Sequence, residues 1–160
     1  MGKRTVPRLY FVTPAWRRFA LSAVCFDQRL GVMDELAAMG IEAHCVVVAD
    51  DENLELARAR GFDTVERDND WLARRFNDGI EYAGSHGADW IVPVGSDSWV
   101  QADYFAPLPE EGEVRTSTYL CTVTADRLAH LEIKPNHGGG PYIVPRSMLE
   151  PSRFRPAKPK

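Results

Sequence analysis

Four short polar segments hold the side chains whose types and spacing could bind a charged ligand. Each follows an apolar, strand-like run, and the segments are Thr13-Pro14-Ala15, Asp50-Asp51, Asp68-Asn69 and Gly95-Ser96-Asp97-Ser98. In an open parallel sheet, ligands lie beyond the carboxyl ends of the strands, where such segments leave the sheet. The sequence therefore predicts one crevice lined by carboxylate, amide and hydroxyl groups.

The chain contains neither the GxGxxG pattern of dinucleotide folds nor the GxxxxGK[ST] pattern of P-loops. If the crevice binds phosphates, a divalent cation held by Asp97 is the simplest way to neutralise them, since Mg²⁺ and Mn²⁺ prefer carboxylate oxygens and keep positions open for phosphate. A second interpretation stays open for each candidate. Asp97 could be a turn aspartate that accepts backbone amides, and Asp50-Asp51 could serve only the turn into the next helix.

The elements that must position these segments alternate along the chain. Apolar runs predict strands at residues 8–13, 43–48, 64–66 and 90–94, with Pro93 at the margin of the last. Helical spacing predicts helices at residues 16–37, 53–60 and after Asp70. This alternation is typical of a single α/β domain with a mainly parallel central sheet flanked by helices.

The helices are predicted from the spacing of their apolar residues. In the first helix the residues that recur at helical spacing are Trp16, Phe19, Ala20, Ala23, Val24, Leu30, Met33, Leu36 and Ala37. On the third helix Asp70 is expected to cap the N-terminus, and Leu72, Phe76, Ile80 and Ala83 are expected to fall on one face.

The second part of the chain has a different character. Residues 114–124 are strand-like, residues 128–133 fit a strand or a helix, residues 136–141 form a glycine-rich turn, and residues 142–144 favour a short strand. We expect one domain over residues 1–150 and an extended, basic, proline-rich tail over residues 151–160.

Composition narrows the function classes. The 160 residues suffice for one domain with its own core, and the net charge of −4 gives no electrostatic reason to expect nucleic-acid binding by the whole domain. Cys25, Cys45 and Cys121 are odd in number and lie in apolar surroundings, as expected of reduced core thiols. No apolar run approaches about 18 residues, and no secretion signal is recognisable. We expect a cytoplasmic protein without a membrane partner.

Taken together, the polar segments and the elements around them resemble a family 2-type glycosyltransferase domain of the GT-A fold. The matching pieces keep their order and spacing over residues 8–105, and they read FVTPAWRR, VVVADDEN, RDN, LARRFNDGIEYA and VPVGSDSW. The resemblance implies a GT-A (Rossmann-like) domain that binds a nucleotide sugar, UDP-linked by expectation, together with Mn²⁺ or Mg²⁺.

Carried over position by position, the resemblance also implies site residues. Thr13 and Asp51 would contact the nucleobase or ribose, Arg75 and Asn77 would support the donor site, and Asp97 matches the metal-binding aspartate of an Asp-x-Asp motif. The whole set expected at the nucleotide sugar is Thr13, Pro14, Ala15, Asp50, Asp51, Asn69, Arg75, Asn77, Gly95, Ser96 and Asp97. His137 is the second candidate metal ligand, with a surface-loop histidine as the alternative.

The sequence departs from the family pattern at two places. Gly95 stands where the first Asp of the motif is usual, and no Glu-Asp pair marks a catalytic base. The carboxylates in the right part of the chain are Asp103, Glu110, Glu111 and Asp126, and the sequence does not choose among them. Trp16 and Trp99 are expected to pack in the interior rather than to act as sugar platforms.

Three functions follow, in order of preference. The first is a metal-dependent glycosyltransferase that transfers a sugar from a nucleotide-sugar donor. The second, motivated by Gly95, is a catalytically reduced nucleotide-sugar or glycan-binding module of the same fold. The third is a nucleotidyltransferase, for which Arg17 and Arg18 follow the first strand but the expected glycines are missing. The short format also resembles small glycosyltransferase-like proteins of bacteriophages, working in host cytoplasm, so the acceptor could be a protein, a glycan or modified DNA.

Overall fold

A computed structural model gives the structure of residues 6–110, 113–116, 119–123, 128–132 and 142–149. Several sequence predictions fall outside these described residues. They are the turn at 136–141 with His137, the carboxylates Glu111 and Asp126, and the tail at 151–160. For Cys121 the backbone is described but the side chain is not.

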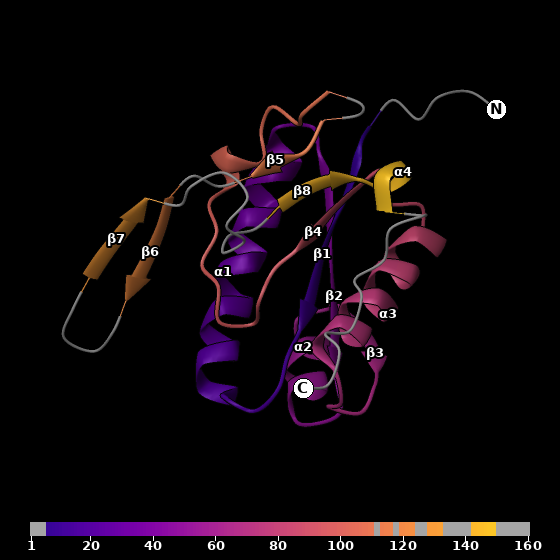
Figure 1. The fold of residues 1–160 in the computed structure, drawn as a ribbon, viewed down its shortest axis with the longest axis vertical. Helices are drawn as coiled ribbons and strands as arrows, with labels where there is room; N and C mark the ends of the chain where they lie inside the picture. The colour runs from indigo at the N-terminus through magenta and orange to yellow at the C-terminus, as the bar shows by residue number, and fades with distance from the viewer. Residues whose placement is uncertain (1–5, 111–112, 117–118, 124–127, 133–141, 150–160) are drawn as a thin grey trace, which may run out of the picture.

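The described elements confirm the predicted alternation of strands and helices (Figure 1). The first part of the chain consists of β1 (Arg8–Pro14), α1 (Phe19–Ala38), β2 (Glu42–Ala49), α2 (Asn53–Arg58), β3 (Asp63–Glu66), α3 (Leu72–Ser85) and β4 (Trp90–Pro93). The second part consists of the short 3-10 helix η1 (Ala102–Tyr104), β5 (Arg115–Thr116), β6 (Tyr119–Val123), β7 (Leu128–Glu132), β8 (Tyr142–Pro145) and α4 (Arg146–Leu149). The described part of the ambiguous segment, residues 128–132, is therefore a strand.

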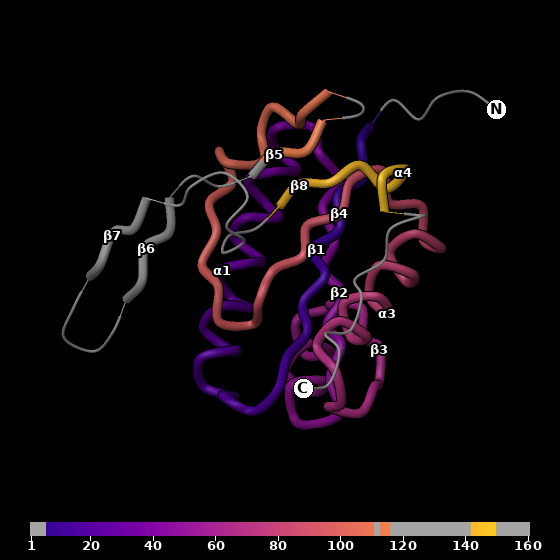
Figure 2. Tube along the Cα trace, in the orientation of Figure 1, coloured from indigo at the N-terminus to yellow at the C-terminus, as the bar shows by residue number. Residues whose placement is uncertain are grey.

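Within the described part of the chain, the main sheet has six strands in the order β3-β2-β1-β4-β8-β5. The pairs β3–β2, β2–β1 and β1–β4 are parallel, whereas β8 runs antiparallel to both β4 and β5. The chain steps outward from β1 to β3 and then returns to place β4 on the other side of β1, as the tube in Figure 2 shows. The strand order therefore reverses between β1 and β4, which is where open α/β sheets bind ligands.

Helices cover both faces of this sheet, with α1 and α3 on opposite sides (Figure 1). On one face α1 and α2 pack on a core that includes Leu9, Phe11 and Val47. On the other face α3 packs on Tyr10, Val12, Val46 and neighbouring residues. Residues 45–49 of β2 are buried on both faces, which explains their continuous apolar sequence.

The helix predicted from apolar spacing is confirmed as α1, but those apolar residues do not all share its buried side. Of that set Leu36 is fully buried and Leu30 and Met33 pack partly buried against the core, while Trp16 and Val24 are among the exposed large apolar side chains. The buried stripe instead consists of Ser22, Cys25, Phe26, Arg29, Val32 and Leu36. This stripe also has helical spacing, but two of its members are polar, so a search for apolar residues alone selects the neighbouring face.

On α3 the prediction is confirmed for Ile80 and Ala83, which are buried, but Leu72 is exposed. Asp70 is not the N-cap, because Trp71 occupies that position and no side chain caps the helix. Asp70 instead forms ion pairs with Arg67 and Arg74 at 3.3 and 3.0 Å.

The Asp70 ion pairs predict a pH dependence. Desolvation raises the pKa of Asp70, but the Trp71 amide and the guanidinium groups of Arg74 and Arg67 outweigh it and lower the pKa to about 2. Because the folded-state pKa lies below the unfolded value, this contribution to stability is present above about pH 4 and is lost as the pH falls toward about 2. Urea unfolding should show wild type more stable than Asp70→Asn at about pH 6 and a shrinking difference below about pH 4. A difference that stays constant with pH would contradict this origin.

Within the described residues, no helix is long and apolar enough to cross a lipid bilayer.

Candidate functional site

The candidate site lies at the carboxyl edge of the parallel strands. The loops that follow β1, β2, β3 and β4 meet there, as the sequence predicts, and direct hydrogen bonds connect them. The first of these bonds continues the sheet, since the Ala15 amide donates to the Val48 carbonyl at 3.0 Å.

Asp51 fixes the loop after β1 to the loop after β2. Its Oδ2 accepts the Arg17 backbone amide at 2.7 Å, and its Oδ1 accepts the Asn53 amide and the Asn53 Nδ2 at 3.0 and 2.8 Å. Asn53 is fully buried and also donates from Nδ2 to the Arg17 carbonyl at 3.1 Å. Asp51 therefore has the turn-forming role that the sequence left open as its second interpretation, with both carboxylate oxygens engaged by the chain itself.

Asp50 and Arg75 connect the remaining loops on this side. Asp50 accepts the Asn69 amide at 2.8 Å, which joins the loops after β2 and β3. Arg75, almost fully buried on α3, donates to the Ala15 carbonyl at 3.0 Å, and burial lowers its pKa despite the nearby carboxylates of Asp50, Asp70 and Asp51. Asn77 lies half-buried on the same helix.

The segment Thr13-Pro14-Ala15 turns its side chains into the interior. All three are buried, and the Thr13 hydroxyl accepts a hydrogen bond from Arg29 Nη1 at 2.8 Å. Arg29 also donates from Nη2 to the Ser98 carbonyl at 3.0 Å. One guanidinium therefore connects the end of β1 to the loop after β4, directly below the edge where the strand order reverses.

Arg29 is a cation in the core. It is fully buried, its Nε has no hydrogen-bond partner, and no described residue forms a salt bridge with it. Burial raises the pKa values of the nearby Cys25 and Cys45 thiols, so these thiols stay neutral, while burial lowers the pKa of Arg29. The face of Phe11, whose centroid lies 5.3 Å from Arg29 Cζ, supplies a further favourable contact.

Arg17 and Arg18 both adopt the left-handed backbone conformation, with φ of 52° and 51°. This conformation costs a non-glycine residue on the order of 1–3 kcal/mol and persists where surrounding contacts impose it. Here Asp51 and Asn53 hold both backbone polar groups of Arg17. The turn directs Arg18 to Asp97, whose Oδ2 accepts Nη1 at 2.6 Å, and both side chains are exposed, at 66% and 43%.

Gly95 starts the turn that presents Asp97. The Ser98 amide donates to the Gly95 carbonyl at 3.3 Å, and Ser96 is buried. A Cβ atom at position 95 would lie 2.7 Å from Asp97 Oδ1 and 3.1 Å from Ser98 Oγ. An aspartate at position 95, as in an Asp-x-Asp motif, would therefore force the Asp97 carboxylate to move.

The described residues do not fit the divalent cation that the sequence implies. Among them no group of three His, Cys, Asp or Glu side chains could hold a metal ion. Asp97 already pairs with Arg18, Gly95 supplies no oxygen ligand from a side chain, and His137 lies outside the described residues. Of the candidate catalytic bases, Asp103 and Glu110 are described, and both are exposed.

Sequence reasoning missed several residues at this edge. Arg29 and Asn53 both form hydrogen bonds across loops, and only the helical spacing of Arg29 with Cys25, Phe26 and Leu36 could have indicated burial. The expectation that Trp16 and Trp99 pack in the interior is wrong, because they are 45% and 65% exposed. Arg17 covers one face of Trp16, with its Cζ 4.4 Å from the ring centroid.

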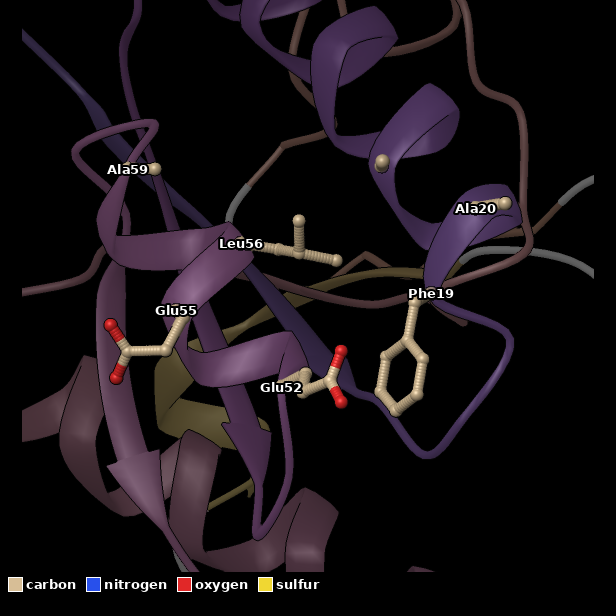
Figure 3. Close-up of a pocket in the computed structure, with 7 residues that line it drawn as sticks. Phe19, Ala20, Glu52, Glu55, Leu56 and Ala59 are labelled. Atoms are coloured by element: carbon tan, nitrogen blue, oxygen red, sulfur yellow. The ribbon is translucent and has the colours of Figure 1, made fainter.

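A groove of about 440 Å³ lies between α1 and α2, beside this edge. Phe19, Ala20, Ala23, Leu56 and Ala59 give it a mostly apolar lining. In Figure 3 the side chains of Phe19 and Leu56 face the space between the two helices, whereas Glu55 points away from it. Its lining differs from the charged loops at the strand ends.

Comparisons with known proteins give matches in structure alone. No protein-family model matches the sequence, and a search of curated proteins found no match. A Drosophila β-1,4-galactosyltransferase 7 variant in complex with manganese, UDP-Gal and xylobiose superposes with a TM-score of 0.61 at 16% identity, covering 91% of this chain and 51% of that one. This chain thus spans about half the length of the galactosyltransferase chain.

Two nucleotidyltransferases are also similar. A CMP:2-keto-3-deoxy-manno-octonic acid synthetase in complex with CTP has a TM-score of 0.51 at 14% identity, covering 92% of this chain and 76% of that one. A cytidylyltransferase from Leptospira borgpetersenii has a TM-score of 0.52 at 15% identity, covering 93% of this chain and 63% of that one. The chain therefore has the α/β fold of nucleotide-sugar transferases and related nucleotidyltransferases, which confirms the predicted fold class. None of these matches points to a bacteriophage.

Proposed function

We propose that this protein is a glycosyltransferase that binds a nucleotide-sugar donor, UDP-linked by preference, across the carboxyl ends of β1 and β4. The observation that carries the proposal is the set of charged and polar loops joined at the reversal of strand order. The fold shared with a UDP-Gal-binding galactosyltransferase supports the same reading.

The proposal divides the site residues into two groups. One group shapes the edge, because its side chains form hydrogen bonds that join neighbouring loops. It consists of Asp51, Asn53, Arg29 and Arg75. Asp50, Asn69, Ser96 and Asp97 remain candidates for contacts with the donor. From Thr13, Pro14 and Ala15 the backbone, rather than the buried side chains, would face the ligand.

During transfer, negative charge develops on the departing nucleoside diphosphate, and fixed positive charge or hydrogen-bond donors near it lower the barrier. Arg18 is an exposed cation at this edge, positioned by the turn after β1. An inverting reaction would also need a general base for the acceptor hydroxyl. The acceptor, whether protein, glycan or modified DNA, is left open.

The sequence suggests two ligands for a metal ion, Asp97 and His137. Of these, Asp97 lies among the described residues, and His137 stays a proposed ligand. Because the described donor set does not form a metal site, the proposed chemistry includes no metal step. Cytoplasmic location stays part of the proposal, supported by the free buried thiols of Cys25 and Cys45.

Calorimetric titration tests the proposal directly. We expect UDP-sugars to bind wild type with micromolar to millimolar affinity, and the negative charge introduced by Asn69→Asp, beside Asp50, to weaken binding at least about tenfold. The variant Asp27→Asn is the control, because it alters an exposed carboxylate that pairs with the partly buried Arg60 near the other end of α2. Absence of binding to any nucleotide sugar would refute the proposal.

A second candidate is a nucleotidyltransferase, favoured by the position of Arg17 and Arg18 after β1 and by the larger share of the synthetase chain that is covered. Incubation with CTP and a sugar acid would then release pyrophosphate, whereas a glycosyltransferase would release UDP from a UDP-sugar. Donor binding without release of either product across a broad acceptor panel would indicate a catalytically reduced binding module.

A further inference from the structure

We propose that Arg18 supplies the positive charge for the donor diphosphate, so that the protein binds its nucleotide sugar without a divalent cation. This inference rests on the proposed function. It assigns to Arg18 the task that the sequence resemblance gives to a metal ion at Asp97.

The first support is the state of Asp97. Its Oδ2 already accepts Arg18 Nη1 at 2.6 Å, a charge-assisted hydrogen bond at the short end of its range. A metal ion at this carboxylate would have to displace the guanidinium. The described residues also offer no group of three His, Cys, Asp or Glu side chains that could hold such an ion. The cation at this position is therefore part of the chain.

The second support is the strained turn. Two consecutive arginines in the left-handed region are unusual, and the backbone bonds from Asp51 and Asn53 impose this conformation on Arg17. The result is that Arg18 extends from the loop after β1 to the loop after β4. It therefore spans the place where the strand order reverses and where ligands bind in such sheets.

The third support is the donor capacity of Arg18. A guanidinium carries five N–H groups, and its contact with Asp97 is the one hydrogen bond that the described residues make to it. With a side chain 66% exposed, the other N–H groups are open to phosphate oxygens, which arginine binds in a bidentate manner. Asp97 then acts as a positioning residue that orients the guanidinium.

Titration of UDP and a UDP-sugar in EDTA and in Mn²⁺ tests the inference with two variants. Arg18→Gln removes the charge and should weaken binding at least about tenfold. Asp97→Asn keeps an oxygen that can accept from Arg18 but removes the negative charge, so binding should persist in EDTA and should fall less than in Arg18→Gln. Arg58→Gln removes the same charge from an ion pair with Glu55 on α2 and serves as the control.

For wild type we expect the dissociation constants measured in EDTA and in Mn²⁺ to agree within about threefold. Because the side chains of Arg18 and Asp97 are exposed, both variants should melt close to wild type, and melting temperature verifies their folding. Binding that requires Mn²⁺ and is lost in Asp97→Asn would overturn the inference while the proposed function stands. No binding under either condition would refute both.

Discussion

Arg29→Ala should lower the free energy of unfolding by about 2–5 kcal/mol. The substitution empties the space of a fully buried side chain that is among the largest in the core. It also leaves the Ser98 carbonyl without its charged donor and removes the donor to the Thr13 hydroxyl. Urea unfolding of wild type and variant measures this difference.

Arg29→Met is the matched control for this prediction. Methionine fills much of the same volume without the charge, and apolar replacements of buried charges are often tolerated. The methionine variant should therefore be more stable than the alanine variant by at least about 1 kcal/mol. An alanine variant within about 0.5 kcal/mol of wild type would contradict the role of Arg29 as the connection between β1 and the loop after β4.

Gly79→Ala should destabilise the protein by about 1–3 kcal/mol, because α3 lies too close to the sheet for a methyl group at this position. A Cβ atom there would lie 2.4 Å from Val12 Cγ1 and 3.1 Å from Val48 Cγ2. Both valines are fully buried, so neither can swing into solvent. Thermal unfolding of the variant reports the loss.

Gly84→Ala on the same helix is the control, because its nearest neighbour is the flexible Arg146 side chain at 3.4 Å. There alanine should be neutral or stabilise by up to about 1 kcal/mol through its helix propensity. Adding Val12→Ala to Gly79→Ala removes the clashing methyl and should give a double variant less destabilised than the sum of the two changes. Strict additivity would contradict the close approach.

The parallel part of the fold could be predicted because its signals are local. The continuous apolar run of β2 and the alternation of strands with helices determine which segments share the sheet and place their following loops at one edge. The antiparallel insertion of β8 between β4 and β5 could not be predicted, since the pairing partners of β8 are distant in sequence.

The meeting of the polar loops could be predicted from the sequence, but the contacts between them could not. Asp50, Asp51, Asn69 and Asp97 do lie in loops that meet. The bonding of Asp51 to the chain itself depends on the backbone conformation of Arg17, which no sequence pattern indicates for a non-glycine residue. Arg29 was missed because charged residues are almost never fully buried unless paired.

The most direct test of the central claim is a crystallographic measurement of where UDP binds, with and without Mn²⁺. The account predicts difference density for the diphosphate at the carboxyl ends of β1 and β4, in contact with Arg18 under both conditions. UDP in the groove between α1 and α2, or a diphosphate bound through an ion on Asp97 with Arg18 displaced, would contradict it.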